Sequence, residues 1–262
     1  MIHSTAIISK SAEIDPTVEV GAFCVIGDKV KIQSGTKIKS HVVIDGDTTI
    51  GKNNTIFPFA TIGLVPQDLK FKGEESKLII GDNNTIREHA TIHLGTQDGG
   101  LLTKIGNNNL LMVGVHIAHD CMVGNHVILA NNATMAGHVV IGDHVVVGGL
   151  SAVHQFVRIG DFAMIGGMSG VESDVIPYGL VMGERASLAG LNLVGMKRNN
   201  ISREEIHALR NFYKLIFNNE DQTSFVERAN KIAVEFADKQ TVKIVADFIN
   251  SETSRSFCQP KN

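Results

Sequence analysis

Four histidines between positions 116 and 154 of this 262-residue chain are the residues best suited to chemistry: His116, His119, His138 and His154. A histidine titrates near neutral pH, so it can act as a general base. His119 is followed directly by Asp120, whose carboxylate could fix the tautomer of an imidazole. We therefore expect His119 to be the base of an active site.

Gly137 could supply a second requirement of such a site, a donor for developing negative charge. It lies eighteen residues after His119. A glycine lets a substrate approach the backbone closely, and its N–H can stabilise an oxyanion. A base together with a backbone donor suits acyl transfer to a hydroxyl. No serine or cysteine motif suggests a covalent intermediate, so direct attack by the hydroxyl is the simpler hypothesis.

The separation of eighteen matters because the chain repeats every six residues. Aliphatic residues recur at this interval from Ile2 to Ile62 and again from Ile105 to Val171. The period is typical of a hexapeptide-repeat, left-handed parallel β-helix. Three hexads make one coil, and neighbouring coils stack about 4.8 Å apart. The four histidines are therefore expected within about 10 Å of one another along the axis.

Two local features of the repeat carry further expectations. Asn54 stands where other hexads have a small or β-branched residue, so a ladder of side-chain amides or a local bulge could form there. Gly21, Gly27, Gly51 and Gly63 follow aliphatic positions of the repeat. We expect them at turns where the backbone has a positive φ.

The patterning divides the chain into a β-helix over residues 1–189 and a small helical domain over residues 190–262. Polar segments near 64–78 and 95–103 interrupt the repeat and are expected to leave the solenoid as loops. Such loops commonly lie on a binding face, although a tolerated surface insertion is an open alternative. Capping boxes at 202–205 and 224–227 predict two helices, and a third is expected over 242–249. These helices would cover an open end of the solenoid.

Composition limits the partners and the compartment. The formal charge of −3 gives no reason to expect nucleic acid or an anionic membrane surface. Three scattered cysteines are too few for a disulfide framework. No leader precedes the repeat, and no apolar run approaches the roughly 20 residues that a membrane helix needs. A soluble cytoplasmic protein without membrane insertion or cofactor is expected.

A metal site is the main competing interpretation, since clustered histidines are zinc ligands. Zinc carbonic anhydrases of this fold place two ligand histidines five residues apart. No pair among the eleven histidines has that spacing, so the pattern disfavours a metal. His126 and His144 are also eighteen apart but belong to another face, where solvated or stacked side chains are expected.

Six motifs together resemble one family, the bacterial UDP-N-acetylglucosamine O-acyltransferases that open lipid A biosynthesis. They are H-I-A-H-D-C at 116–121, L-A-N-N-A-T-M-A-G-H at 129–138, A-V-H-Q-F at 152–156, Q-D-L-K at 67–70, I-H-L-G-T at 92–96 and M-K-R at 196–198. The resemblance covers the whole chain. A bare hexapeptide repeat is shared by many acetyltransferases, but these motifs together are specific.

The resemblance implies a soluble homotrimer with active sites in the clefts between subunits. It would move an (R)-3-hydroxyacyl chain from acyl carrier protein to the 3-hydroxyl of UDP-N-acetylglucosamine. By the family pattern His119 is the general base, Asp120 orients it, and the Gly137 N–H stabilises the oxyanion. The residues implied to bind substrate are Asp68, Lys70, His116, His138, His154, Gln155, Gly167, Asn192 and Arg198.

Within that set, Asn192 and Arg198 would meet the nucleotide, where a guanidinium suits phosphate. Gly167 corresponds to the position that limits acyl length and, as glycine, leaves room for a longer chain than methionine would. Gln155 and Asn192 could instead simply satisfy backbone groups. Asn199 stands where several relatives have a second basic residue, and Arg185 where some have histidine near the acyl tail. Basic groups on the helical domain could receive the acidic carrier protein: Arg210, Lys214 and Lys239.

Two rival functions remain. An N-acyltransferase acting on an amino sugar shares the repeat, but that family usually has an additional N-terminal domain. A structural or surface-binding scaffold would show ladders of one residue type, whereas the histidines, Asp120 and Gly137 form a non-repeating cluster.

Overall fold

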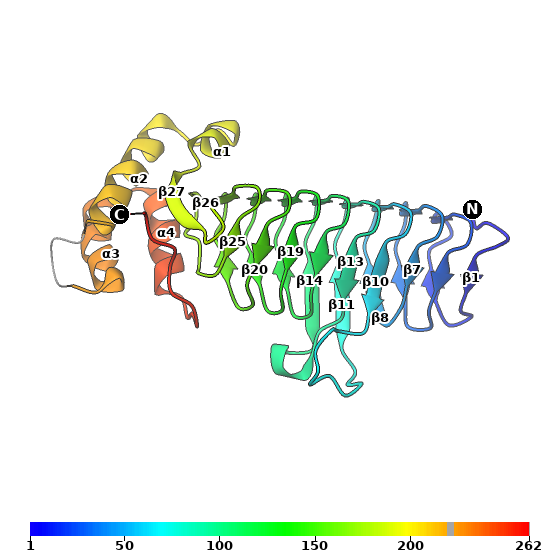
Figure 1. Ribbon diagram of the computed structural model, residues 1–262. Coiled ribbons are helices and arrows are strands. Elements are labelled where there is room, and N and C mark those ends of the chain that lie inside the picture. Colours follow the sequence, from blue (N-terminus) through cyan, green and yellow to red (C-terminus); the bar gives the residue numbers. More distant parts are fainter. Residues whose placement is uncertain (219–222, 262) are drawn as a thin grey trace.

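The computed structural model describes residues 1–218 and 223–261, and it consists of a long solenoid with helices at its C-terminal end (Figure 1). The solenoid has three sheets of short strands, in which each strand pairs in parallel with a strand one coil away. The exception is the last strand, β27 (Ser187–Leu191), which pairs antiparallel with β26 (Gly179–Met182). The predicted left-handed parallel β-helix is confirmed. Up to β26, consecutive strands of the chain belong to different sheets, so the three sheets form the three faces of a prism.

The strands of each face follow in coil order. The first sheet contains β1 (Ile7–Ile8), β4 (Val25–Ile26), β7 (Val43–Ile44), β10 (Thr61–Leu64), β13 (Thr91–His93), β16 (His116–Ile117), β19 (Thr134–Met135), β22 (Ala152–Val153) and β25 (Gly170–Val171). The second contains β2 (Glu13–Ile14), β5 (Lys31–Ile32), β8 (Asp47–Ile50), β11 (Lys77–Ile80), β14 (Leu102–Ile105), β17 (Met122–Val123), β20 (Val140–Ile141) and β23 (Arg158–Ile159). The third contains β3 (Glu19–Val20), β6 (Lys37–Ile38), β9 (Thr55–Ile56), β12 (Thr85–Ile86), β15 (Leu110–Leu111), β18 (Ile128–Leu129), β21 (Val146–Val147), β24 (Met164–Ile165), β26 (Gly179–Met182) and β27 (Ser187–Leu191).

The aliphatic residue of each hexad points into the prism and stacks on its counterpart in the next coil. Ile117 pairs with Met135, and Met135 pairs with Val153. All three side chains are buried. Each coil thus buries its aliphatic ring against its neighbours, and the solenoid has one continuous core.

Asn54 occupies the second inward position of its hexad. Of the two structures expected there, an amide ladder or a local bulge, the ladder is observed. The Asn54 side chain donates to the Gly81 carbonyl (2.9 Å) and accepts from the Asn84 N–H (2.8 Å). Asn84 repeats the pattern with Asn109, whose N–H donates to the Asn84 amide oxygen at 2.9 Å. All three side chains are buried, so the ladder satisfies polar groups that would otherwise lie unpaired in the core.

The expectation of positive φ is confirmed at Gly63 (77°) and wrong at the other three repeat glycines. Gly21, Gly27 and Gly51 are not among the residues with positive φ, which instead fall two positions later, for example at Phe23 (58°) and Asn53 (55°). The glycines are needed for another reason. A Cβ at each would overlap the backbone or an aspartate of the next coil. Close stacking of the coils, rather than the turn, therefore selects glycine.

Two loops leave the solenoid at the edge where the first and second sheets meet. One connects β10 to β11, and the other connects β13 to β14 and contains the short helix η1 (Gln97–Gly99). Figure 1 shows both loops projecting below the prism, on the side away from the first helix after the solenoid. They lie next to each other, because Lys70 of the first loop pairs with Asp98 of the second at 2.6 Å.

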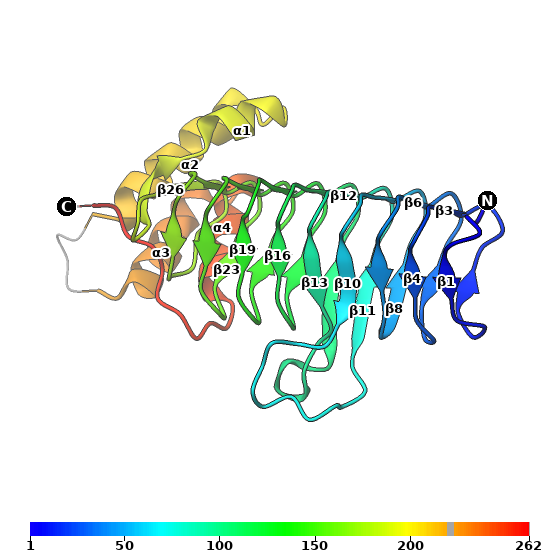
Figure 2. The ribbon, with the colours of Figure 1, turned by 45° about the vertical axis from the view of Figure 1, so that its right-hand side comes forward.

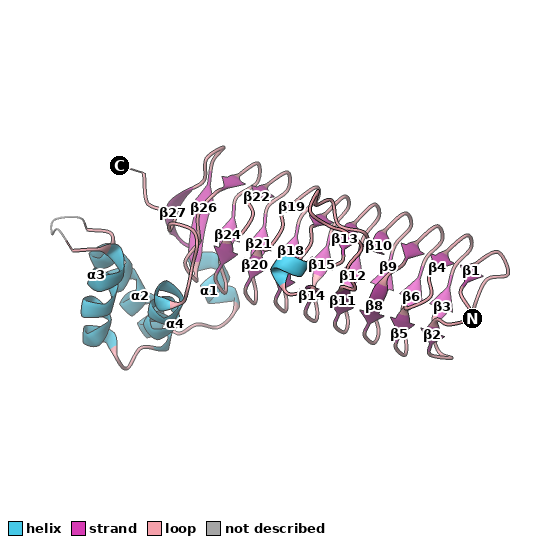
Figure 3. Ribbon diagram, turned by 90° about the horizontal axis from the view of Figure 1, so that it is seen from below, coloured by secondary structure: helices cyan, strands magenta, loops and turns pink. Residues whose placement is uncertain are grey.

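The helices pack together at the C-terminal end of the solenoid (Figure 3). They are α1 (Leu193–Arg198), α2 (Arg203–Ile216), α3 (Phe225–Ala233), η2 (Val234–Phe236) and α4 (Gln240–Asn250). Ser224 and Glu227 form the expected capping box. Ser202 caps α2, but Glu205 does not reach back to it. The Glu205 carboxylate instead accepts hydrogen bonds from the Thr241 N–H (2.8 Å) and hydroxyl (2.7 Å), which ties the start of α4 to α2.

Among the described helices, none is both long enough and apolar enough to cross a bilayer.

The core of the solenoid can be tested at two adjacent positions of β20. Ile141 points inward and is 2% exposed, whereas Val140 points outward and is 41% exposed. Ile141→Ala should lower the free energy of unfolding by about 2–5 kcal/mol, because it leaves a cavity between stacked coils. Val140→Ala, the matched control, should lower it by less than about 1 kcal/mol. Chemical denaturation measures both, and equal effects would contradict the inward stacking.

Candidate active site

The cluster of expected catalytic residues lies at the edge between the first and second sheets, the edge from which the two loops leave. His119 and Asp120 occupy the turn between β16 and β17, and Gly137 and His138 occupy the turn one coil further on. The His138 N–H donates to the His119 carbonyl at 3.0 Å. Coil stacking therefore brings all four residues together.

His119 and Asp120 form a hydrogen-bonded pair. The His119 Nδ1 lies 2.7 Å from the Asp120 Oδ2. The Asp120 side chain is 1% exposed and the His119 side chain 13% exposed. Because a carboxylate only accepts, the Nδ1 carries the proton and the Nε2 lone pair is left available. This is the arrangement of a base with an orienting carboxylate.

The second loop holds the Asp120 carboxylate in place. The Thr96 N–H donates to Oδ1 at 2.7 Å, and the Thr96 hydroxyl donates to Oδ2 at 2.6 Å. The Asp120 N–H donates in turn to the Thr103 hydroxyl at 2.8 Å. A Cβ at Gly99 would overlap the Asp120 carboxylate, so the loop packs directly on it. Thr96 and Gly99 were missed in the sequence, where no period links them to Asp120.

Gly137 packs against the ring of His119. A Cβ at Gly137 would lie 2.7 Å from the His119 Nε2, so any side chain there would displace the imidazole. Among the described residues, no protein acceptor takes the Gly137 N–H. A free backbone donor next to the nitrogen of a base is what the sequence interpretation requires.

His138 lies over Asp120 and is supported by Phe156 in the next coil. Its ring is 5.1 Å from that of His119, edge to face, and stacks on Phe156 at 4.4 Å. Its Nδ1 is 3.8 Å from the Asp120 Oδ2. Burial lowers the pKa of His138 below its ordinary value, although the Asp120 carboxylate acts in the opposite direction. The neutral form is therefore favoured.

His116 has a buried histidine neighbour that was not singled out in the sequence. The His116 Nδ1 is 2.7 Å from the Thr91 hydroxyl, and its ring lies 5.0 Å from that of His93. His93 is 6% exposed, and its Nδ1 has no hydrogen-bond partner among the described residues. Burial lowers the pKa of His93 to about 4, and it lowers the pKa of His116 as well. In the sequence, the only signal for His93 was that it belongs to the motif I-H-L-G-T at 92–96.

Asp68 and Lys70 lie in the first loop, near the same edge. The Lys70 Nζ is 2.6 Å from Asp98 and 3.9 Å from Asp68. Asp68 accepts the Lys70 N–H at 2.9 Å, which holds the loop in a turn. Both groups act electrostatically on His138, so the loop lies close to the histidines.

His154 and Gln155 lie one coil beyond Gly137, and both are exposed. The Gln155 side chain makes no hydrogen bond with the rest of the described chain, so it does not satisfy a backbone group there. Both residues instead contact Arg255 of the C-terminal segment, which sequence reasoning did not single out. The Arg255 Nη2 is 2.8 Å from the His154 Nδ1.

Asn192 and Arg198 lie elsewhere. They line a cavity of about 570 Å³ over the third sheet, together with Asn199, Val194 and the outward residues of β18, β21 and β24. That sheet is the face opposite the edge that carries His119. The Asn192 side chain caps α1 through Gly195 (2.9 Å) and donates to the Phe162 carbonyl (2.9 Å). The Asn192 side chain therefore satisfies backbone groups, which was the alternative to a role in binding the nucleotide.

His126 and His144 line the same cavity and stack as expected. Their rings are 4.7 Å apart, and His144 stacks on Phe162 at 4.7 Å. Gly167 is exposed near this face. A Cβ at Gly167 would make an ordinary contact, 3.4 Å from the Gly149 carbonyl oxygen, so a larger side chain can be accommodated.

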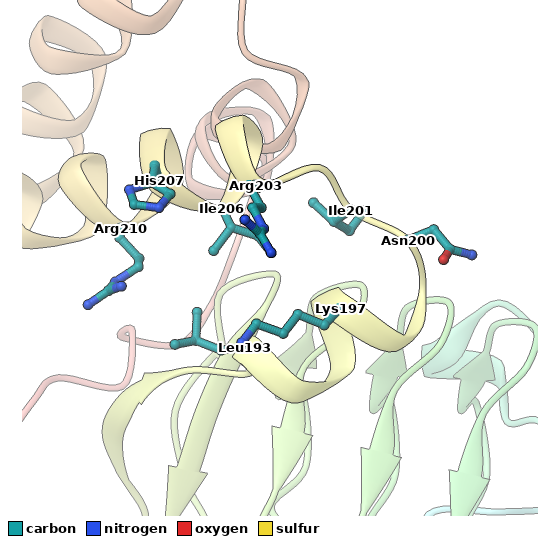
Figure 4. Close-up of a pocket in the computed structure, with 8 residues that line it drawn as sticks. All are labelled: Leu193, Lys197, Asn200, Ile201, Arg203, Ile206, His207 and Arg210. Carbon is teal, nitrogen blue, oxygen red and sulfur yellow. The ribbon is translucent and has the colours of Figure 1, made fainter.

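Another cavity, of about 700 Å³, separates α1 from α2 (Figure 4). Its lining includes Lys197, Arg203, His207 and Arg210, which makes it basic. Arg210 also borders a neighbouring depression with Lys214. Lys239 differs from Arg210 and Lys214 in that its ammonium group forms ion pairs with Glu204 and with Asp238.

The structure does contain a group of three residues that could in principle bind a metal ion, as the competing interpretation requires. One potential ligand atom each from His119, Asp120 and His138 lies within 4.8 Å of the others. Zinc bonds of about 2.0–2.2 Å would hold ligand atoms more than 3 Å apart. The 2.7 Å between His119 and Asp120 is instead the length of a shared hydrogen bond. The residues as arranged fit a proton better than a metal ion.

Known proteins resemble the chain over its whole length. Residues 102–137 match the family model of the bacterial transferase hexapeptide (six repeats), and residues 174–258 match that of UDP N-acetylglucosamine O-acyltransferase, domain 2. The chain is 54% identical to an acyl-[acyl-carrier-protein]–UDP-N-acetylglucosamine O-acyltransferase of Rickettsia canadensis, over 98% of this chain and 97% of that protein. A similarly named protein of Thermodesulfovibrio yellowstonii is 50% identical over 98% and 99%.

Solved structures agree with these matches. The structure of LpxA from Acinetobacter baumannii has a TM-score of 0.95 at 48% identity, covering 98% of this chain and 99% of that one. The UDP-N-acetylglucosamine O-acyltransferase of Moraxella catarrhalis has a TM-score of 0.94 at 44% identity, with the same coverage.

His93 predicts a specific loss of stability in acid. The folded protein keeps His93 neutral down to about pH 4, whereas the unfolded chain protonates it near 6.5. Between these values the unfolded state binds the extra proton, so stability falls as the pH falls. The wild type should lose about 3 kcal/mol more than His93→Gln between pH 6.5 and 4. Denaturant titrations at several pH values measure this difference, and parallel pH profiles would contradict it.

Proposed function

Because this chain belongs to the family of acyl-[acyl-carrier-protein]–UDP-N-acetylglucosamine O-acyltransferases, we propose that it catalyses their acyl transfer in lipid A biosynthesis. The acyl group is an (R)-3-hydroxyacyl chain on acyl carrier protein, and the acceptor is the 3-hydroxyl of UDP-N-acetylglucosamine. The observation that carries the proposal is the His119–Asp120 pair next to Gly137, whose N–H has no protein acceptor among the described residues. The reaction needs no cofactor and is expected in the cytoplasm.

The mechanism is a direct attack. The His119 Nε2 takes the proton of the sugar hydroxyl while its Nδ1–H stays bonded to Asp120. The hydroxyl oxygen forms a bond to the thioester carbonyl carbon, and the carbonyl oxygen becomes an oxyanion that accepts the Gly137 N–H. The intermediate collapses by breaking the carbon–sulfur bond. The leaving thiolate takes the proton back from His119, so no charge is left on the enzyme.

The surroundings support this role for His119. Burial favours the neutral forms of His93, His116 and His138. His119 is therefore not next to another imidazolium when it becomes protonated. Its positive charge is compensated by the buried Asp120 carboxylate, which Thr96 holds with two hydrogen bonds. This arrangement favours proton transfer in the transition state.

We assign substrate binding to two separate surfaces. Near the base, the groups that would hold the sugar and the acyl chain are Asp68, Lys70, His116, His138, His154 and Gln155. Asn192 and Arg198 would hold the nucleotide, where the guanidinium can bind phosphate with two hydrogen bonds. Because these two lie across the prism from His119, the nucleotide must be held by a second copy of the chain. A homotrimer with shared sites meets this need.

The carrier protein would dock on the helical domain. Arg210 and Lys214 border one depression and are exposed. Lys239 is a weaker candidate than the sequence suggested, because its ammonium group already pairs with Glu204 and Asp238. Neither Arg210 nor Lys214 has an ion-pair partner within residues 1–218 and 223–261, so an acidic carrier could bind both without displacing one there.

An acyl-transfer assay tests the function. Purified protein with UDP-N-acetylglucosamine and 3-hydroxyacyl carrier proteins of several lengths should form the 3-O-acyl product. His119→Ala should lower kcat by roughly 10²–10⁴-fold through loss of the base. His3→Ala, a histidine replacement at the far end of the solenoid, should not. Product formed only with an amino-sugar acceptor would instead indicate the N-acyltransferase. Loss of activity when a chelator is added would indicate a metal enzyme. No product with any acceptor would indicate a scaffold.

Gly167→Met should shorten the preferred acyl chain. The wild-type position has room for a side chain, and a methionine would fill part of the space assigned to the end of the acyl group. Loss of burial for two or more methylenes should lower kcat/KM for the longest accepted chain by at least about tenfold. The shortest chains serve as the internal control. An unchanged ranking of chain lengths would show that Gly167 does not border the acyl group.

A further inference from the structure

The C-terminal segment after α4 returns to the solenoid and lies along its last coils, as the red trace in Figures 1 and 2 shows. Backbone hydrogen bonds attach it. The Cys258 N–H donates to the Asp174 carbonyl at 2.8 Å, and the Leu188 N–H donates to the Gln259 carbonyl at 2.9 Å. The segment therefore has a fixed register on the solenoid.

A buried carboxylate fixes the start of this segment. Asp174 is fully buried, and its Oδ1 accepts the Arg158 N–H at 2.8 Å. Its Oδ2 accepts the Arg158 Nε–H at 2.8 Å and the Thr253 hydroxyl at 2.6 Å. The Thr253 oxygen accepts the Arg255 N–H at 3.0 Å. Asp174 thus determines where the backbone of Arg255 lies.

The Arg255 side chain then reaches the edge of the proposed site. Its Nη2 is 2.8 Å from the His154 Nδ1, and its Nε donates to the Gln155 carbonyl at 3.1 Å. A guanidinium can only donate, so the His154 Nδ1 accepts and the ring proton lies on Nε2. A second contact, 3.3 Å between that Nδ1 and the Gln155 carbonyl, would need a proton on Nδ1. The contact with Arg255 is the shorter one, and a guanidinium must donate, so the proton is not on Nδ1.

We propose that Arg255 is a positioning residue for His154 and Gln155, and through them for binding of the sugar nucleotide. This role rests on the proposed function. Gln155 precedes Phe156, whose N–H donates to the Gly137 carbonyl at 3.1 Å and whose ring supports His138. Fixing the Gln155 carbonyl therefore steadies the turn that supports the ring of His138, one of the groups assigned to the sugar.

A purely structural role for Arg255 would be to hold the tail. The tail, however, has its own attachments through Thr253, Cys258 and Leu188, none of which uses the Arg255 guanidinium. Loss of the Arg255 guanidinium should therefore increase the mobility of residues 154–157, while residues 256–260 stay bound to the solenoid. The two roles predict different places of increased mobility.

Three variants of the full-length protein test the proposal. Arg255→Met should raise KM for UDP-N-acetylglucosamine about three- to tenfold and leave kcat nearly unchanged, since hydrogen bonds of a charged group are lost without touching the base. Arg255→Lys keeps the charge but lacks the planar fork, so an intermediate KM is expected. Lys261→Met, which removes a cation from the same segment, should leave KM unchanged.

Hydrogen–deuterium exchange of the same variants gives a readout that does not need activity. Arg255→Met should exchange faster at residues 154–157, with no change at 256–260. Unchanged KM and unchanged exchange at 154–157 would overturn the proposal, and so would faster exchange confined to the tail. If the wild type transfers no acyl group, the proposed function fails, and exchange at 154–157 alone then decides whether Arg255 positions this turn.

Discussion

Hydrogen bonds between stacked coils are the interaction on which the rest of this structure depends. They hold residues that are one coil apart next to each other, so a side chain in one turn contacts a residue in the turn of the next coil. His119 contacts Gly137 and His138 for this reason, and His138 rests on Phe156. The continuous aliphatic core makes the coils rigid. The proposed base and the proposed backbone donor are thereby held next to each other by the coils themselves.

The stacked coils alone would leave the Asp120 carboxylate at an exposed edge. The second loop changes this, because Thr96 donates two hydrogen bonds to the carboxylate and Gly99 packs against it. The first loop is joined to the second through Lys70 and Asp98. The interruptions of the repeat therefore bury the Asp120 carboxylate, and in this respect they are part of the edge to which we assign catalysis.

The repeat allowed the β-helix, its coil length and the contact of His119 with Gly137 to be predicted, because a period fixes which residues become neighbours. It also predicted the amide ladder at Asn54 as one of two alternatives. It could not predict contacts that follow no period. Thr96 and Arg255 reach the site from a loop and from the C-terminal segment, and Glu205 binds Thr241 instead of closing its capping box. Such contacts depend on how separate segments pack, and local sequence does not encode them.

The prism is the basis for proposing a site shared between copies of the chain. His119 lies at the edge opposite the face that carries Arg198, so under the proposed function the base and the nucleotide contact come from different copies. Mixing His119→Ala with Arg198→Ala, after unfolding and refolding the two together, tests this most directly. Each variant alone should be nearly inactive at low UDP-N-acetylglucosamine. Random assembly of trimers should restore about a quarter of the wild-type sites, since each such site takes its base from one variant and its arginine from the other. A mixture no more active than its components would contradict a site shared between chains.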